Sequence, residues 1–373
     1  MKIAVYGICL NEEAFVERFT ASARDADLIQ IADTGSTDNT VPLFEGLGVT
    51  LTHIRINPWR FDDARNAALD LLPDDIDICV SLDLDTVLHP GWRKALEAAW
   101  LPTVNRVYYS EVWGRTADGA PRRFLNNRVH ARHGYRWTSP CHEYLRNDGV
   151  EEVSNVAPGF VIEQFSDPNK PRSQYLPLLE LAAREQPNAA RHAHYLGREL
   201  TFENRWDEAI AEFERYLAMD TRDFEAERSG TLRLMAGAEA ERGDLDRALA
   251  LFQRATEEAP SLRGAWEDLA YAYYEREMWQ ACYDAALRAM TLPRTINFYG
   301  EEALCGVLPE DMASICGWRL GHRREALEYG RKAVRLAPNV DRLRANVRRM
   351  EEGLGLPVSD LGYGQTIASI ILH

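Results

Sequence analysis

A unit that recurs four times in the second half of the chain restricts that half to a narrow set of folds. In each copy a small residue is followed, seven positions later, by alanine or tyrosine. The small residues are Ala209, Ala248, Cys282 and Ala326, and the residues seven positions later are Tyr216, Ala255, Ala289 and Ala333. Three copies close with a proline, at Pro260, Pro293 and Pro338. One step, from 248 to 282, spans 34 residues, which is the tetratricopeptide period.

A generic helical bundle would not repeat this spacing. We therefore expect an all-α, tetratricopeptide-like repeat domain over residues 174–345, followed by a tail at 346–373. Helix pairs of this kind stack into a curved array whose concave face suits extended partners.

The first half instead alternates expected strands with expected helices. Strands are expected at 2–8, 27–32, 49–54 and 76–82, and helices at 12–23, 41–47 and 62–72. Further strands are expected near 105–113 and 159–163. This order predicts an α/β domain, with a mostly parallel, Rossmann-like sheet and helices on both faces. The polar, proline-containing stretch 166–171 marks its end, so the domain is predicted to span 1–165.

Carboxylates follow two of the expected strands. Asp33 ends the second strand, and Asp83 and Asp85 follow the apolar run 76–82. Ligands of such sheets bind beyond the carboxyl ends of the strands. Carboxylates at i and i+2 can also offer oxygens to a hard divalent cation. The alternatives are a polar strand exit for the pair and, for Asp33, an Asx turn that leads into Gly35.

Several short motifs carry a family resemblance, and they occur in the family's order. They are Ile8–Glu13, Asp33–Thr40, Trp59 with Phe61–Leu69, Leu82–Asp85, and His142-Glu143. Together they resemble a family 2 glycosyltransferase of the GT-A fold, in the branch that carries tetratricopeptide repeats. The resemblance covers roughly residues 1–165.

The resemblance implies a nucleotide-sugar site. By that analogy Asn11 and Asp33 lie at the nucleotide, with Asp33 accepting hydrogen bonds from the base. Arg65 would contact the donor diphosphate, although pairing with Asp62 and Asp63 in the first turn of its helix is an alternative. Asp83 and Asp85 resemble the DXD motif, and Asp83 would lie on the ribose side.

The same analogy assigns the metal and the base. Asp85 would hold Mn²⁺ or Mg²⁺, and His142 would complete the metal site or stack near the phosphates. Glu143 would be the general base that deprotonates the acceptor, with Glu111 and Asp118 as rival bases. The alternative for Glu143 is a salt bridge to a nearby arginine. The family often has a histidine near the end of the last strand, and residues 161–164 contain none.

A basic stretch leaves two interpretations open. It consists of Arg122, Arg123, Arg128, Arg132 and Arg136. These side chains would contact phosphate or acceptor, or they would form a solvated loop that balances nearby acids.

Composition excludes some functions. The formal net charge of −15 disfavours nonspecific binding to nucleic acid, which needs clustered cations. The chain has no apolar run of about 18 residues, so we expect no membrane helix, and its first residues are typical of a strand rather than a signal peptide. The six scattered cysteines form no CxxC pair, which indicates buried thiols and a cytoplasmic location.

We therefore expect a metal-dependent, inverting glycosyltransferase that moves a sugar from a UDP-sugar to an acceptor. A protein or peptide held on the repeat surface fits best, and a homodimer is a further expectation. One alternative is a non-catalytic, nucleotide-binding repeat scaffold for protein–protein interaction. Another is a glycosyltransferase acting on modified DNA or carbohydrate. A nucleotidyltransferase is disfavoured because no glycine-rich phosphate loop follows the first strand.

Overall fold

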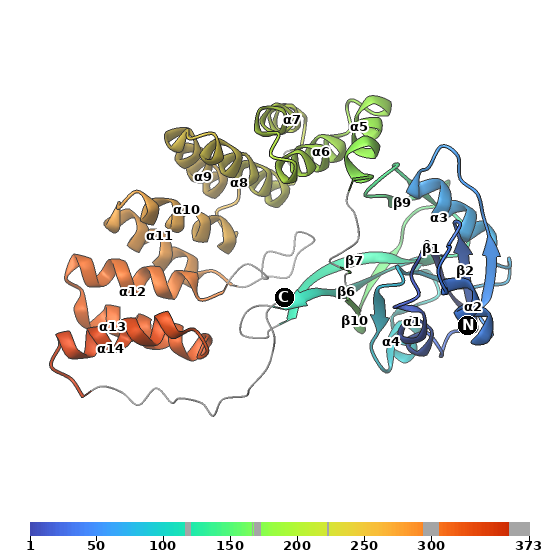
Figure 1. Ribbon diagram of the computed structural model, residues 1–373, viewed down its shortest axis with the longest axis horizontal. Coiled ribbons are helices and arrows are strands. Elements are labelled where there is room, and N and C mark those ends of the chain that lie inside the picture. Colours follow the sequence, from blue (N-terminus) through green and yellow to red (C-terminus); the bar gives the residue numbers. More distant parts are fainter. Residues whose placement is uncertain (116–120, 166, 168–172, 222–223, 294–305, 358–373) are drawn as a thin grey trace.

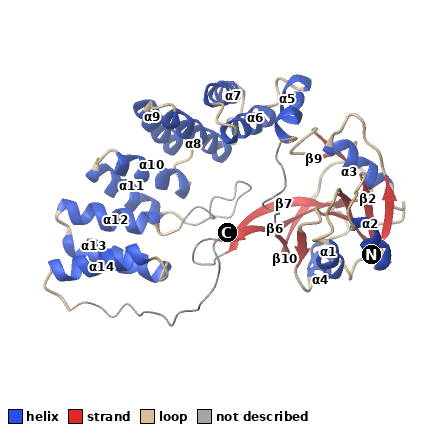
Figure 2. Cartoon of the chain, viewed as in Figure 1, coloured by secondary structure: helices blue, strands red, loops and turns tan. Residues whose placement is uncertain are grey.

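The chain consists of an α/β unit followed by a series of helices that trace an arc (Figure 1). The computed structural model describes residues 1–115, 121–165, 167, 173–221, 224–293 and 306–357. Strands are confined to the first part of the described chain, and the part after residue 173 is helical (Figure 2). The predicted division into an α/β half and an all-α half is confirmed.

The strands of the α/β unit form one mixed sheet and one small hairpin. Within the described residues the sheet has the order β3-β2-β1-β4-β7-β6-β10-β5. Its strands are β1 (Ile3–Cys9), β2 (Leu28–Asp33), β3 (Thr50–His53), β4 (Ile78–Ser81), β5 (Thr86–Leu88), β6 (Arg106–Arg115), β7 (Pro121–Ala131) and β10 (Ser154–Gln164). The hairpin pairs β8 (Tyr135–Thr138) with β9 (Tyr144–Asn147).

Parallel pairing dominates the first half of the sheet. Strands β3, β2, β1 and β4 are parallel to one another, as β6 is to β10. The β4–β7, β6–β7 and β5–β10 pairs are antiparallel. The sheet is thus more mixed than the predicted Rossmann-like arrangement, because β7 inserts beside β4 with the opposite direction.

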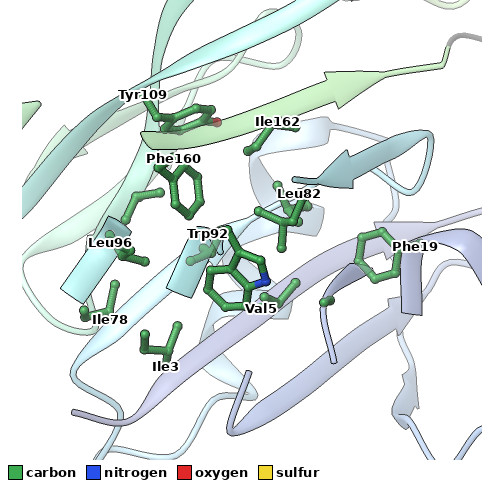
Figure 3. Packing of buried hydrophobic residues seen from close by; sticks show 14 of the residues in the cluster. Ile3, Val5, Phe19, Ile78, Leu82, Trp92, Leu96, Tyr109, Phe160 and Ile162 are labelled. Carbon is green, nitrogen blue, oxygen red and sulfur yellow. The ribbon is translucent and has the colours of Figure 1, made fainter. Parts of the chain in front are cut away.

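Helices cover both faces of the sheet, as the alternation along β1 requires. Ile3 and Val5 enter the cluster that contains Trp92 and Phe160 (Figure 3). Helices α1 (Val16–Ser22) and α4 (Trp92–Ala99) contribute to this cluster, and α2 (Thr40–Gly46) adds Phe44. Ala4 and Tyr6 point to the opposite face and join residues of α3 (Phe61–Asp70). Helix α3 therefore packs on the face of the sheet that Ala4 and Tyr6 line.

The helical part is built from successive packed helices. They are α5 (Tyr175–Glu185), α6 (Ala190–Phe202), α7 (Trp206–Ala218), α8 (Glu225–Glu241), α9 (Leu245–Glu258), α10 (Arg263–Glu275), α11 (Trp279–Thr291), α12 (Leu308–Leu320), α13 (Arg323–Leu336) and α14 (Asp341–Gly353). The recurring small residues and the residues seven positions later are all buried, at the seams between helices. The predicted tetratricopeptide-like repeat is confirmed. The tail predicted at 346–373 is helical as far as Gly353 of α14, and its part beyond residue 357 lies outside the described residues.

The first two helices of this series pack directly on the α/β unit. Phe61 stacks on Tyr175 of α5 with ring centroids 6.1 Å apart, and Cys141 is buried in the same cluster as residues of α5 to α9. Arg60 also pairs with Glu185 at 2.6 Å. Among the described residues, no helix combines the length and the apolar character that crossing a membrane requires. The described cysteines are buried and free.

Candidate functional site

The carboxyl ends of β1, β2 and β4 bring the candidate residues to one edge of the sheet. These strands are adjacent and parallel, so the residues after them emerge at the same edge. Asn11 follows β1, Asp33 ends β2, and Asp83 and Asp85 follow β4. Helix α3 places Arg65 over the same edge, as its bond to Asp83 shows.

Asp33 organises the turn that follows its own strand. Its carboxylate accepts hydrogen bonds from the backbone N–H groups of Gly35 and Ser36 at 3.1 Å, and His53 Nδ1 lies 3.0 Å from Oδ2. This is the Asx turn that the sequence left as an alternative. Burial acts to raise the pKa of Asp33, but the hydrogen bonds from Ser36 and His53 outweigh it, so the pKa is lowered. Asp33 is therefore an ionised acceptor.

Asn11 joins the first and second strands at this edge. Its backbone is left-handed, with φ 55°, a conformation that asparagine tolerates. The side-chain Oδ1 accepts a hydrogen bond from the backbone N–H of Thr37 at 2.7 Å. The Asn11 N–H in turn donates to Ser36 Oγ at 2.9 Å. Asn11 thus fixes the loop after Asp33.

Two arginines and two carboxylates form the centre of the site, and we call Arg65, Arg128, Asp83 and Glu143 the charge cluster. Arg65 Nη2 donates to Asp83 Oδ1 and Arg65 Nε donates to Glu143 Oε1, both at 2.5 Å. Arg128 Nη1 donates to the other oxygen of Asp83 at 2.7 Å. The ring of Trp137 lies 5.1 Å from the Arg65 guanidinium and 5.9 Å from that of Arg128. The salt bridge that the sequence left as an alternative for Glu143 is therefore present, and its partner is Arg65.

The electrostatics of the charge cluster keep Asp83 and the two arginines ionised. Burial acts to raise the pKa of Asp83, but the charges of Arg65 and Arg128 dominate and lower it well below its ordinary value. Burial acts to lower the pKa of both arginines, and the facing carboxylates reverse that effect. Two guanidinium groups are thereby held on one side of a site, which is an arrangement suited to a diphosphate.

Asp85 and Glu111 lie next to the charge cluster. Gln164 Nε2 of β10 donates to Asp85 Oδ2 at 3.1 Å, and Asn126 Nδ2 donates to Glu111 Oε2 at 2.6 Å. Burial raises the pKa of Glu111, and the nearby charges of Asp83 and Asp85 add to the shift against the opposing effect of Arg128. The pKa of Glu111 is therefore raised while that of Asp83 is lowered.

His142 faces the helical part of the chain. Its ring stacks on Tyr195 of α6 with centroids 4.2 Å apart and planes 15° from parallel. Arg198 Nη2 lies 3.3 Å from His142 Nε2. Because a guanidinium can only donate, Nε2 must be an acceptor, and the neutral ring carries its proton on Nδ1. Asp85 accepts a hydrogen bond from Gln164 of β10, whereas His142 packs against α6.

The comparisons with known proteins agree with this architecture. Residues 5–162 match the protein family described as Glycosyl transferase family 2. The α/β unit is a family 2 glycosyl transferase domain. A search of curated proteins found no match to the chain.

Solved structures resemble the helical part at low similarity. A MamA from Desulfovibrio magneticus RS-1 is 14% identical, with 44% of this chain and 85% of that chain covered and a TM-score of 0.37. PilF of Pseudomonas aeruginosa is 12% identical, with 48% and 72% covered and a TM-score of 0.37. YrrB, described as a TPR protein with an unusual peptide-binding site, is 17% identical, with 49% and 84% covered and a TM-score of 0.35.

The arginines of the basic stretch do not act together in the structure. Arg132 donates to the backbone carbonyl of Leu72 at 2.8 Å, and Arg136 pairs with Asp70, so both hold the end of α3. Arg128 alone of the five joins the charge cluster. Its place beside Asp83 depends on the pairing of β7 with β4, and no local pattern of the sequence indicates it.

The described residues contain no group of three or more His, Cys, Asp or Glu side chains arranged to hold a metal ion. Such a group is not required where a cation is bound by one or two carboxylates together with substrate phosphates. Asp118, the third candidate base, lies outside the described residues.

Proposed function

We propose that this chain is a divalent-metal-dependent, inverting glycosyltransferase that transfers a sugar from a UDP-sugar to an acceptor. The observation that carries the proposal is the charge cluster, which places two ionised arginines at the carboxyl edge of a family 2 domain. A donor diphosphate is the anion that such a pair would bind.

The donor is proposed to lie along the edge formed by β2, β1 and β4. Asp33, an ionised acceptor, would receive a hydrogen bond from the uracil N–H, and Asn11 would keep the adjoining loop in place. Asp83 would lie at the ribose. Since Asp83 and Glu143 occupy the arginines in the absence of a donor, the diphosphate would exchange with one of these carboxylates at Arg65 or Arg128. The bound diphosphate would then supply the arginine with the negative charge that the displaced carboxylate had supplied.

The donor set next to the charge cluster fits a hard cation. Asp85 offers carboxylate oxygens, and both oxygens of Asp83 are already bound by arginines. We therefore propose that Asp85 holds Mn²⁺ or Mg²⁺ together with the donor phosphates, with His142 as a second ligand only after its ring moves. When bound, such an ion supplies positive charge that stabilises the departing nucleoside diphosphate.

The general base is proposed to be Glu143, with Glu111 as its rival. Glu143 lies within the charge cluster, where the hydrogen bond from Arg65 Nε orients its carboxylate. Burial raises the pKa of Glu111 above its ordinary value, a change in the direction that favours a general base. The base would deprotonate the acceptor as it attacks the anomeric carbon from the face opposite the leaving group, which inverts that centre.

The acceptor is proposed to be a protein or peptide. The stacked helix pairs α6–α7, α8–α9, α10–α11 and α12–α13 form an extended array, and arrays of this kind present surfaces suited to extended chains. The array begins beside the loop that carries Glu143, since α6 contacts the neighbouring His142. A segment bound along the helices could therefore present a side chain to the transferase domain.

Calorimetric titration with UDP, with and without Mn²⁺, tests the donor site. Wild type should bind UDP more tightly with Mn²⁺, and Asp85→Asn should lose that metal-dependent gain. Asp74→Asn, which alters a side chain that is 88% exposed, is the matched control and should behave as wild type. Tight binding of another nucleotide instead of UDP would change the donor, and no nucleotide binding would favour the repeat scaffold.

A screen of UDP release from UDP-sugars then tests catalysis. Release that depends on added protein or peptide acceptor supports the proposal. Metal-dependent UDP binding with no release on any acceptor or water would identify a non-catalytic scaffold, which is the second candidate function.

A further inference from the structure

One face of α6 contacts the loop that carries His142 and Glu143. Arg191, Tyr195 and Arg198 are spaced at i, i+4 and i+7, which places them on one side of the helix. The guanidinium groups of Arg191 and Arg198 each lie 4.6 Å from the centre of the Tyr195 ring. We call these three residues the α6 face.

All three members of the α6 face engage His142. The imidazole stacks on Tyr195 at 4.2 Å. Arg198 lies 3.3 Å from its Nε2, and Arg191 Nη2 donates to the His142 carbonyl at 3.1 Å. Ring, ring nitrogen and backbone are therefore each held by a different residue of the same helix.

The contacted loop has an uncommon backbone. Ser139 has φ 89° and His142 has φ 49°, both in the left-handed region. Residues other than glycine keep this backbone conformation only when the surrounding structure imposes it. The loop also accepts a hydrogen bond from the start of α3, because the N–H of Phe61 donates to the Pro140 carbonyl at 3.0 Å. The α6 face contacts the ring, the ring nitrogen and the carbonyl of His142, and Tyr175 of α5 adds a looser ring contact at 6.1 Å.

The next residue connects this loop to the donor site. Glu143 is 7% exposed, and it binds Arg65, which is 4% exposed and binds Asp83 in turn. A shift of His142 would therefore move the carboxylate of Glu143, since the two residues are adjacent in the chain. The line of contacts runs from α6 to the strand end after β4.

We infer that the α6 face is a positioning element of the transferase site, so that the first repeat completes the site rather than only joining it to the acceptor surface. This inference rests on the proposed function for its catalytic consequence. Its structural part, control of the His142–Glu143 loop by α6, is independent of the reaction.

The first test is hydrogen–deuterium exchange of the peptide that spans residues 138–147 in the full-length chain. Tyr195→Ala should raise its exchange rate at least about tenfold, because one aromatic stack and two cation–π contacts are lost. Tyr195→Phe keeps the ring and should restore wild-type exchange. Glu185→Gln is the matched control, since it removes another contact between α5 and the α/β unit without touching His142.

Two outcomes would overturn the inference. Unchanged exchange in Tyr195→Ala would show that the loop holds its conformation without α6. An equal rise in Glu185→Gln would show that the loop responds to any loosening of domain packing. Neither outcome depends on the identity of the donor or acceptor.

Steady-state release of UDP provides the second test, with the UDP-sugar that wild type uses best. Tyr195→Ala should lower kcat about 10- to 100-fold and change the donor KM by less than about threefold, as expected for a misplaced catalytic group. Glu185→Gln and Tyr195→Phe should match wild type. An unchanged kcat in Tyr195→Ala would refute the catalytic part, whereas no release by wild type would refute the proposed function and leave the exchange result to decide the loop.

Discussion

Replacing Arg65 by methionine should expose how strongly the charge cluster depends on its buried cation. The side chain of Arg65 is 4% exposed, and that of its partner Glu143 is 7% exposed. Methionine fills similar apolar space but leaves the Glu143 carboxylate without the guanidinium. Arg128 still holds Asp83, so the uncompensated buried charge in Arg65→Met is that of Glu143.

The expected cost follows from that burial. Breaking a buried pair by removing one partner costs about 3–5 kcal/mol, which is a large part of the roughly 5–15 kcal/mol that stabilises a typical domain. Removing both charges, in Arg65→Met with Glu143→Gln, should be milder than the sum of the single changes. A coupling energy of about 2–3 kcal/mol is expected for residues in direct contact.

Urea unfolding of wild type, both single variants and the double variant measures this coupling. The transition of the α/β unit should be followed by hydrogen exchange of its core peptides, because a chain with two parts need not unfold in one step. Single and double variants that add to within about 0.5 kcal/mol would refute the reasoning. The ion pair would then contribute little, whatever its burial.

Three further predictions concern the identity of the general base, the raised pKa of Glu111 and the packing of the first repeat. Glu143→Gln should reduce UDP release by at least about 100-fold while Glu111→Gln retains most of it; the reverse result would assign the base to Glu111. Because burial raises the pKa of Glu111 in the folded chain, its contribution to stability is present below the unfolded value of about 4.3 and is lost as pH rises through the folded pKa. Glu111→Gln should therefore flatten the fall in unfolding free energy above that pH, and an unaltered profile would contradict the assignment. Gly197→Ala should destabilise the first repeat by about 1–3 kcal/mol, because a Cβ there would lie 2.6 Å from the Phe213 ring, and this exceeds the gain in helix propensity of at most about 1 kcal/mol. Gly237→Ala, in a helix where a Cβ meets nothing within 4 Å, should show that gain alone, and equal thermal shifts in the two variants would contradict the packing argument.

The linear pattern was sufficient for the main elements. Alternation of strand and helix signals located β1 to β4, and the seven-residue spacing located the buried seams of the repeats. Elements without such a signal were missed. The short strand β5, the helix α4 and the hairpin β8–β9 were not expected. Strand β5 is stabilised by β10, which is distant in the sequence.

Candidate residues divide in the same way. Asp33, Asp83 and Asp85 stand at strand ends, so the order of the strands was enough to predict that they share an edge. The sequence could not select Arg128 from five arginines, since the selection depends on β7 lying beside β4 in an antiparallel direction. It also could not choose between a free and a paired Glu143, because the partner, Arg65, is 78 residues away.

The sequence by itself determined the main strands of the α/β unit and the buried seams of the repeats, since hydrophobic periodicity and small-residue spacing are local properties of the chain. Tertiary structure decided which charges meet. Coulomb and hydrogen-bond energies depend on distances of a few ångströms, and folding sets these distances between residues far apart in the chain. That is why Arg65 joins Asp83 to Glu143 and why α6 contacts His142 across a separation of 56 residues, two facts that no local pattern contains.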